Sequence, residues 1–361
     1  MRTVAHRNHI KTPFAGLISA LSVALICQCA DVFAAQPEYQ SNEAPPPGSV
    51  KDVRESLGPQ AIEKPPPRRG VLGWDRALAN LPQFFRDTSL ILKPRLYNFD
   101  SNFSDGEENE AFALGSAIEY RSGSWRNLLK VGLTGYTSQK AHGPRDKGGT
   151  GLLKPVQTGF GVLGEAYVDV DTGLGAKIFL YRRGLNLPYL NRDDGRMVPL
   201  THELYALTSG MDTYPARWVA GHVSKMKQRD SDRFIAMSEA AGFVGTDEGV
   251  TLAGGSYNFT EHAHIGILNL YSWDFLNIFY AEAANLYSLT DELLVRISGQ
   301  VTSQVSVGEE LGGDTSTWTA GLRAALSYKN FVLALAGTLT GDDSGITSPK
   351  CAKTQPNLKR Q

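Results

Sequence analysis

The sequence predicts an all-β protein, and more specifically a transmembrane antiparallel β-barrel. Apolar residues mostly recur at every second position from Ser89 onward, which is the period of a strand with two unlike faces. The alternating segments are about ten residues long, close to what a tilted strand needs to cross a bilayer and longer than the average of about 5–6 in soluble proteins. Roughly fourteen such segments lie between Ser89 and Thr340.

The two faces of these segments differ in the way that a barrel requires. One face is aliphatic and aromatic, with Tyr and Trp near segment ends, and the other holds Arg, Lys, Glu, Thr, Ser, Gly and Gln. A soluble β-sandwich also alternates, but the long segments and the charges spread along one face favour the barrel. A closed barrel gives every strand a hydrogen-bonded neighbour on both sides, and backbone groups inside a lipid bilayer require such partners.

The connections also alternate between short and long. SGS (122–124) and YKN (328–330) are short, whereas 138–158, 184–201 and 227–247 are long. Short periplasmic turns and long outer loops are typical of bacterial outer-membrane barrels.

The first 34 residues read as a secretory signal peptide. A basic start with Arg2, Arg7 and Lys11 precedes an apolar run and a cleavage signal ending at Ala34. A membrane anchor is the alternative, but the run is short for a span of about 20 residues. Cleavage would leave 33 basic and 36 acidic residues, a balance that argues against a nucleic-acid partner.

The rest of the chain divides into three parts. Residues 35–88 contain two triple-proline runs and a short apolar segment, and we expect a periplasmic arm there. Residues 89–349 form the predicted barrel, and 350–361 lack the alternation. Export and a barrel together predict a place in the outer membrane of a Gram-negative cell.

Several blocks of this barrel resemble the OprD-type substrate-selective porins. SLILKPRLYNFDSNF (89–103) is similar to the first strand of that family, and NRDDGRMVPLTHELYALTS (191–209) is similar to its constricting third loop and the following strand. VAGHVSKMKQRDSD (219–232), GEELGGDTSTWTAGLRAALSY (308–328) and TGDDSGITSP (340–349) resemble later parts. The resemblance covers about residues 89–349.

The resemblance implies a monomeric porin of 18 strands, inserted into outer-membrane lipid by the barrel-assembly machinery. It implies passage of small carboxylate-bearing solutes such as amino acids or aromatic acids. A ladder of basic residues on the inner wall would guide the carboxylate, and inward loops would form a narrow eyelet. Some distant relatives pass oligosaccharides, which remains an alternative.

Strand parity places a set of basic residues on the water-facing side, together with Glu119 and Glu292. Each guanidinium or ammonium group could bind a carboxylate weakly enough to pass it on, although polar lumens always hold some charge. The predicted ladder consists of Lys93, Arg95, Arg121, Lys130, Lys177, Arg183, Arg296 and Arg323.

A long connection with Pro188, Gly195 and Pro199 contains the charged stretch of the predicted eyelet. We expect Asp193, Asp194 and Arg196 to face a zwitterionic or anionic solute there. The alternative is an exposed surface loop with balanced charges.

Other motifs are weaker. GFGVLG (159–164) matches a dinucleotide-binding pattern, but an alternating strand follows instead of a helix. His262 and His264 share a face without a third metal ligand, and GDDSG (341–345) is more typical of a polar loop than of a calcium site. We therefore expect no cofactor, no metal and no enzyme. An outer-membrane hydrolase barrel is the alternative and would need an outward Ser/His pair.

The C-terminal end departs from the family pattern. After Pro349 the chain reads KCAKTQPNLKRQ, without a final aromatic strand, and about four strands of the family pattern are absent. We expect a frameshift or premature stop near Lys350. The alternative is a smaller barrel in which Thr338–Thr340 pairs with the Ser89 strand.

Overall fold

The computed structural model describes residues 80–102, 108–209, 215–290, 292–341 and 345–349, all within one compact unit spanning 40–361. The predicted signal peptide (1–34), the arm up to residue 79 and the tail (350–361) lie outside the described residues. Among the described residues, no helix has the length and apolarity to cross a bilayer. Pro82 directly precedes the short helix α2 (Gln83–Arg86).

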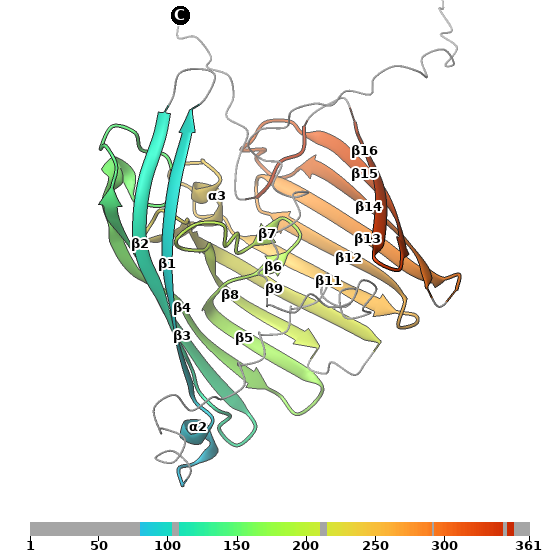
Figure 1. Ribbon diagram of the computed structural model, residues 1–361, viewed down its shortest axis with the longest axis horizontal. Coiled ribbons are helices and arrows are strands. Elements are labelled where there is room, and N and C mark those ends of the chain that lie inside the picture. Colours follow the sequence, from blue (N-terminus) through green and yellow to red (C-terminus); the bar gives the residue numbers. More distant parts are fainter. Residues whose placement is uncertain (1–79, 103–107, 210–214, 291, 342–344, 350–361) are drawn as a thin grey trace, which may run out of the picture. The chain divides into compact units, whose positions relative to one another are not determined.

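Strands dominate the described part of the chain (Figure 1). The first half contains β1 (Ser89–Asn102), β2 (Glu108–Arg121), β3 (Leu129–His142), β4 (Phe160–Asp171), β5 (Ala176–Arg183), β6 (Asn186–Leu187), β7 (Leu190–Asn191) and β8 (Thr201–Ser209). The second half contains β9 (Ala216–Lys227), β10 (Phe234–Ala236), β11 (Val250–Asn258), β12 (Ala263–Ser272), β13 (Leu276–Ser288), β14 (Leu293–Ser306), β15 (Ser316–Tyr328) and β16 (Phe331–Thr340).

These strands form one antiparallel sheet of 14 strands within the described ranges, plus the two-stranded hairpin β6–β7. The sheet runs from β1 to β16 in sequence order, with β6 and β7 outside it and β10 attached to β9. The predicted number of segments is thus confirmed for this part of the chain. The described pairings join β1 to β2 and β16 to β15, so the pairing of Thr338–Thr340 with the Ser89 strand is not seen there.

The period-two pattern creates two different faces. Along β1 every second residue is more exposed, and the exposed positions include Leu92 and Leu96 at 64% and 73%. We call this apolar side the outer face. The opposite side is the inner face, and it carries Lys93, Arg95 and Tyr97 on the same strand. Exposed leucines on one face are what a lipid-facing strand requires.

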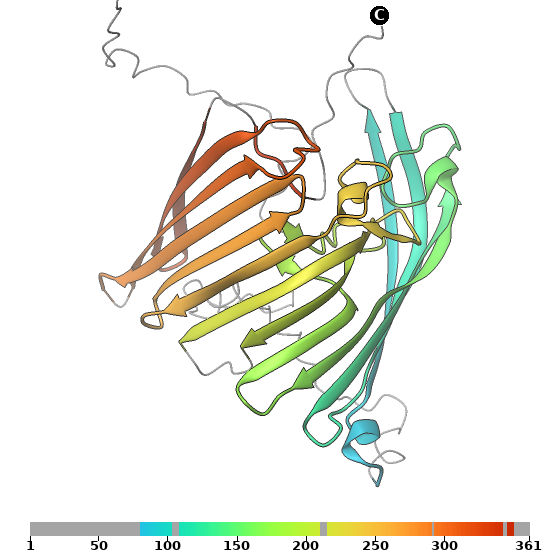
Figure 2. The same cartoon turned by 180° about the vertical axis from the view of Figure 1, so that it is seen from behind.

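Buried apolar residues gather on the inner face in two clusters. Small residues on β2, namely Ala111, Ala113 and Ala117, leave room for Leu152 and Met197 from two long connections. A larger cluster joins the β6–β7 hairpin to β8, β9 and β11–β13. Figure 1 shows the hairpin over these strands, and Figure 2 shows α3 (Met237–Ala240) beside β9 and β10.

Candidate functional site

The connection between β5 and β8, residues 184–200, lies on the inner face of the sheet. Its β6–β7 hairpin turns at Tyr189, which has φ +63°, and pairs Leu187 with Leu190. Leu190 is fully buried against the inner side chains of β8, β9 and β11–β13. Burial of about 1.5–3 kcal/mol per large apolar side chain explains why this loop folds inward instead of standing free at the surface.

The acidic pair of this loop is tied to the protein on two sides. Asp194 accepts two hydrogen bonds from the Arg95 guanidinium, at 2.5 and 2.8 Å. Arg95 also donates to the carbonyl oxygen of Arg196 at 2.9 Å. Asp193 pairs with Arg229, from the connection between β9 and β10. A bidentate guanidinium–carboxylate pair fixes orientation as well as distance, so the loop is held in one place.

Arg196 packs against the wall. Its Nε donates to the carbonyl oxygen of Thr150 at 3.2 Å, and Nη1 donates to the Tyr97 hydroxyl at 3.2 Å. Its guanidinium also lies 4.7 Å from the Phe99 ring centroid. These contacts connect the loop to β1 and to the β3–β4 connection, so donors predicted to face a solute are engaged by the protein itself.

The predicted ladder residues on β1–β3 lie on the inner face around a shared carboxylate. Lys93 Nζ is 2.8 Å from Glu119 Oε1, and Arg121 Nη2 is 3.3 Å from Glu119 Oε2. The Glu119 side chain is 6% exposed, whereas Lys93 is 39% exposed. Lys130, on β3, is exposed and stands opposite Asp169 in the register. Two cations therefore share one buried carboxylate.

Arg183 has a different environment. Its Nη2 is 2.7 Å from Asp169 Oδ1, and both side chains are less than one-tenth exposed. The guanidinium stacks on the Tyr167 and Phe179 rings, 4.4 and 4.2 Å from their centroids. Lys177 stands opposite Asp171 in the same strand pair. Arg183 is therefore part of the packing of the wall.

The remaining two predicted ladder residues lie in another part of the sheet. Arg296 is on β14 and Arg323 is on the neighbouring β15. Arg296 pairs with Ala325, and Arg323 pairs with Ser298, so the two arginines lie two register positions apart. The predicted ladder residues thus form one group on β1–β5 and one on β14–β15.

Two functional features were missed at the sequence level. Arg192 lies 3.8 Å from Asp194 and 3.9 Å from Glu165, so it joins the loop to β4. Its position in the sequence, directly before Asp193 and Asp194, could have indicated this contact. The second feature is the segment 345–348, in which Thr347 exchanges two backbone hydrogen bonds, 2.7 and 2.8 Å long, with the Gln304 amide of β14.

This segment also reaches the hairpin. The hydroxyl of Ser348 donates to the carbonyl oxygen of Tyr189 at 3.4 Å, and Ile346 packs against the larger apolar cluster. Residues 346–348, which directly follow the predicted polar loop (341–345), therefore contribute to the inner loop assembly. Within the described ranges, no group of three or more His, Cys, Asp and Glu side chains is placed to hold a metal. His264 instead lies 3.3 Å from Glu282.

The sequence matches the family model described as outer membrane porin, OprD family, over residues 82–346. The chain belongs to the OprD family of outer-membrane porins. A search of the curated proteins finds no match. The predicted family, the β-barrel fold and the outer-membrane class are confirmed, and porins of this family pass small solutes.

Solved structures of OprD-family porins share the fold of this chain. OccK9 (OpdG) of Pseudomonas aeruginosa aligns with a TM-score of 0.65 and 20% identity, over 73% of this chain and 70% of that chain. OpdK of Pseudomonas aeruginosa with vanillate gives 0.65 and 19%, over 73% and 70%. OccAB3 of Acinetobacter baumannii gives 0.64 and 17%, over 72% and 68%.

Proposed function

We propose that this OprD-family porin carries small carboxylate-bearing solutes, such as amino acids or aromatic acids, along the cations of its inner face. The observation that carries the proposal is the Lys93–Glu119–Arg121 group, in which one buried carboxylate serves two cations. Lys93 is the more exposed of these two cations, at 39% against 21% for Arg121. Charged side chains on a polar wall can bind a solute and still release it, which conduction requires.

The loop 184–200 is the proposed eyelet. Asp193, Asp194 and Arg196 form its charged rim, and their contacts with the wall keep the rim narrow. The structure of OpdK with vanillate supports an aromatic carboxylate as one solute class, because vanillate is such an acid. We further propose export by the signal peptide (1–34), insertion by the barrel-assembly machinery, and a monomer in the membrane.

The test uses the full chain in a planar bilayer. Ion current is recorded while an aromatic carboxylate or its uncharged amide analogue is added, and the half-blocking concentration is measured. We expect Lys93→Gln, Arg121→Gln and Lys130→Gln each to raise that concentration for the carboxylate and to leave the amide unaffected. The matched control is Arg126→Gln, since Arg126 stacks on Trp125 in the short turn between β2 and β3 and is not one of the predicted ladder residues. Equal values in all four variants would refute the ladder.

Replacing Arg196 with Ala tests the eyelet separately. It removes the contacts to Thr150 and Tyr97 and frees the loop on one side. We expect a changed blocking constant for carboxylates. An unchanged constant for every carboxylate tested would contradict the role of this loop.

Two alternatives have direct assays. An oligosaccharide porin would show current block by neutral sugars and no charge dependence. A hydrolase barrel would cleave phospholipid, and the histidine–hydroxyl pair on the outer face, His222 Nδ1 and Thr251 Oγ1 at 3.1 Å, is the pair to test. We expect no cleavage. If cleavage occurs, its loss in Thr251→Val would assign it to this pair.

A further inference from the structure

The loop 184–200 leaves the sheet at a place where β4 lacks a strand neighbour on one side. β4 pairs with β3 from Phe160 to Val170, but its described pairs with β5 cover only 166–171. The cause is local, because β5 ends at Arg183 and the chain then enters the inner loop. Strand pairing therefore does not hold the loop against this stretch of β4.

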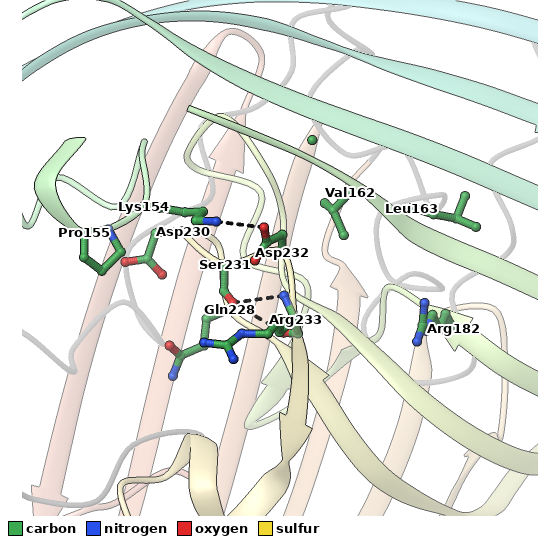
Figure 3. Close-up of a pocket in the computed structure, with 11 residues that line it drawn as sticks. Lys154, Pro155, Val162, Leu163, Arg182, Gln228, Asp230, Ser231, Asp232 and Arg233 are labelled. Atoms are coloured by element: carbon green, nitrogen blue, oxygen red, sulfur yellow. Dashed lines mark hydrogen bonds and ion pairs between the residues drawn. The ribbon is translucent and has the colours of Figure 1, made fainter. Parts of the chain in front are cut away.

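A cavity of about 790 Å³ lies here between β4 and the β9–β10 connection (Figure 3). Val162 and Leu163 of β4 line it, and so does Gln228, the first residue after β9. Within the described residues, the β9–β10 connection adds no strand that pairs with β4. Side chains, and not a strand, must therefore fix the ends of the loop beside this cavity.

Lys227, the last residue of β9, is fully buried at this place. Its Nζ donates to the carbonyl oxygen of Pro199 at 2.9 Å and to that of Gln228 at 2.8 Å. It makes no ion pair within the part of the chain that the structure describes. Because an ammonium group is costly to bury, one that binds only main-chain carbonyls indicates a specific role.

The two hydrogen bonds of Lys227 join segments that are far apart in the sequence. Pro199 is the penultimate residue of the inner loop, and Gln228 begins the β9–β10 connection. The main-chain N–H of Leu200 donates to the carbonyl oxygen of Arg192 at 2.7 Å, which closes the turn that carries the charged rim. Lys227 therefore holds this closed turn at its C-terminal end.

The first residue of the loop is held close by. Glu165 Oε1 accepts a hydrogen bond from the main-chain N–H of Gly184 at 3.2 Å, and Oε2 accepts one from the Thr134 hydroxyl at 3.2 Å. Lys227 Cε lies 3.7 Å from the position that a Cβ on Gly164 would occupy, and Gly164 directly precedes Glu165. Both ends of the loop are thus fixed at one place on β4.

We propose that Lys227 is a positioning residue of the eyelet, which holds the C-terminal end of loop 184–200 at the place where Glu165 holds its first residue. The inference rests on the proposed role of this loop in transport. Lys227 does not contact the solute, since its side chain is fully buried. Its two hydrogen bonds keep the turn with the charged rim at one distance from the wall, and this distance sets the free width of the channel.

The experiment records the full chain in a planar bilayer with benzoate as the blocking solute. Lys227→Met has a side chain of similar length without the two donors. We expect its open-channel noise to increase and its half-blocking concentration to rise about five-fold, the factor that one lost hydrogen bond gives. Lys227→Arg keeps donors at this place and should restore both quantities. Lys225→Met is the matched control, because Lys225 is an exposed lysine on the same strand.

Urea unfolding separates a positioning role from a purely structural one. A structural lysine would lower the stability of Lys227→Met and leave the noise and the benzoate block of the folded channel unchanged, and this result would overturn the proposal. If Lys227→Met does not assemble, Lys227→Gln takes its place, because its shorter amide still supplies a buried donor. We expect a smaller increase in noise for it, and noise equal to that of the unmodified chain would also refute the role of Lys227.

Arg196→Ala, measured beside these variants, distinguishes this inference from the proposed function. If Arg196→Ala changes the benzoate block and Lys227→Met does not, Lys227 has no positioning role and the eyelet stands. If neither variant changes the block, loop 184–200 is not the eyelet and both proposals fail. A change in both variants supports both.

Discussion

The inner face of this porin has two unlike regions. On β1–β5 it is charged, with Lys93, Arg95 and Arg121 in ion pairs. On β9 and β11–β13 it is apolar, and Leu252 and Leu270 are among the buried side chains under the β6–β7 hairpin. Both regions hold the same loop, the charged one through Asp194 and the apolar one through Leu190. The difference teaches that the loop is seated by hydrophobic burial and oriented by charge.

The largest expected effect comes from unseating the loop with Leu190→Asp. This side chain is fully buried in the apolar cluster, and a carboxylate there would cost more than about 4 kcal/mol. The loop should leave its seat, and the conductance in a planar bilayer should rise several-fold. Leu174→Asp is the control, because Leu174 is 90% exposed in a short turn. A conductance equal to that of the unmodified protein would show that charge alone seats the loop.

The next largest effect separates packing from transport within the charged region. Arg183→Met leaves Asp169 buried without its partner, and breaking such a pair destabilises by about 3–5 kcal/mol. Urea unfolding followed by tryptophan fluorescence measures the loss. Adding Asp169→Asn should restore most of the stability, because the unpaired charge is gone. If Arg183→Met instead weakens carboxylate block at normal stability, Arg183 belongs to the ladder.

A smaller effect concerns the ionic tether. A double-mutant cycle with Arg95→Met and Asp194→Asn should give a coupling of about 1 kcal/mol or less, since both side chains are roughly one-third exposed. Open-channel noise should increase in both single variants as the loop moves. Additive effects on noise and stability would mean that the two groups do not act together in the membrane.

The smallest effect is the pH dependence of the partly exposed Lys154–Asp232 pair, which contrasts with the buried Arg183–Asp169 pair. The hydrogen bond from Lys154 lowers the pKa of Asp232 below its ordinary value of 3.8. Because the folded pKa is the lower one, the stabilisation is present above the ordinary value and disappears as the pH falls through the lowered pKa. Carbon NMR of labelled aspartate should show this titration. In Lys154→Met the pKa should return toward its ordinary value, and no change would exclude the pair.

Period-two alternation was enough to predict the strands, their faces and the inward direction of Lys93 and Arg95, because one residue of register decides the face. It could not predict the apolar inner region. Residues 263–280 have apolar side chains at both parities, such as Ile267 on the outer side and Leu268 and Leu270 in the cluster under the hairpin. The sequence alone does not distinguish these two apolar environments.

The sequence also did not predict how deeply a polar side chain is buried or which residues it contacts. Parity places Arg183 inward, but its burial depends on Asp169 and two rings brought together by strand register. Gln304 looks like a polar lumen residue, yet it binds the backbone of Thr347, 43 positions away. Such contacts depend on where a connection returns, and no local pattern encodes that return.

The pairing of Asp194 with Arg95 has a kinetic consequence for the proposed transport. Asp194 is an internal carboxylate on Arg95, a cation of the proposed ladder, and it is tethered at an effective concentration that for short tethers reaches the millimolar range. An arriving solute competes with this internal ligand, and Asp194 can rebind as soon as the solute loosens. The intramolecular competitor shortens the residence time of each solute and keeps the channel from being blocked by what it carries.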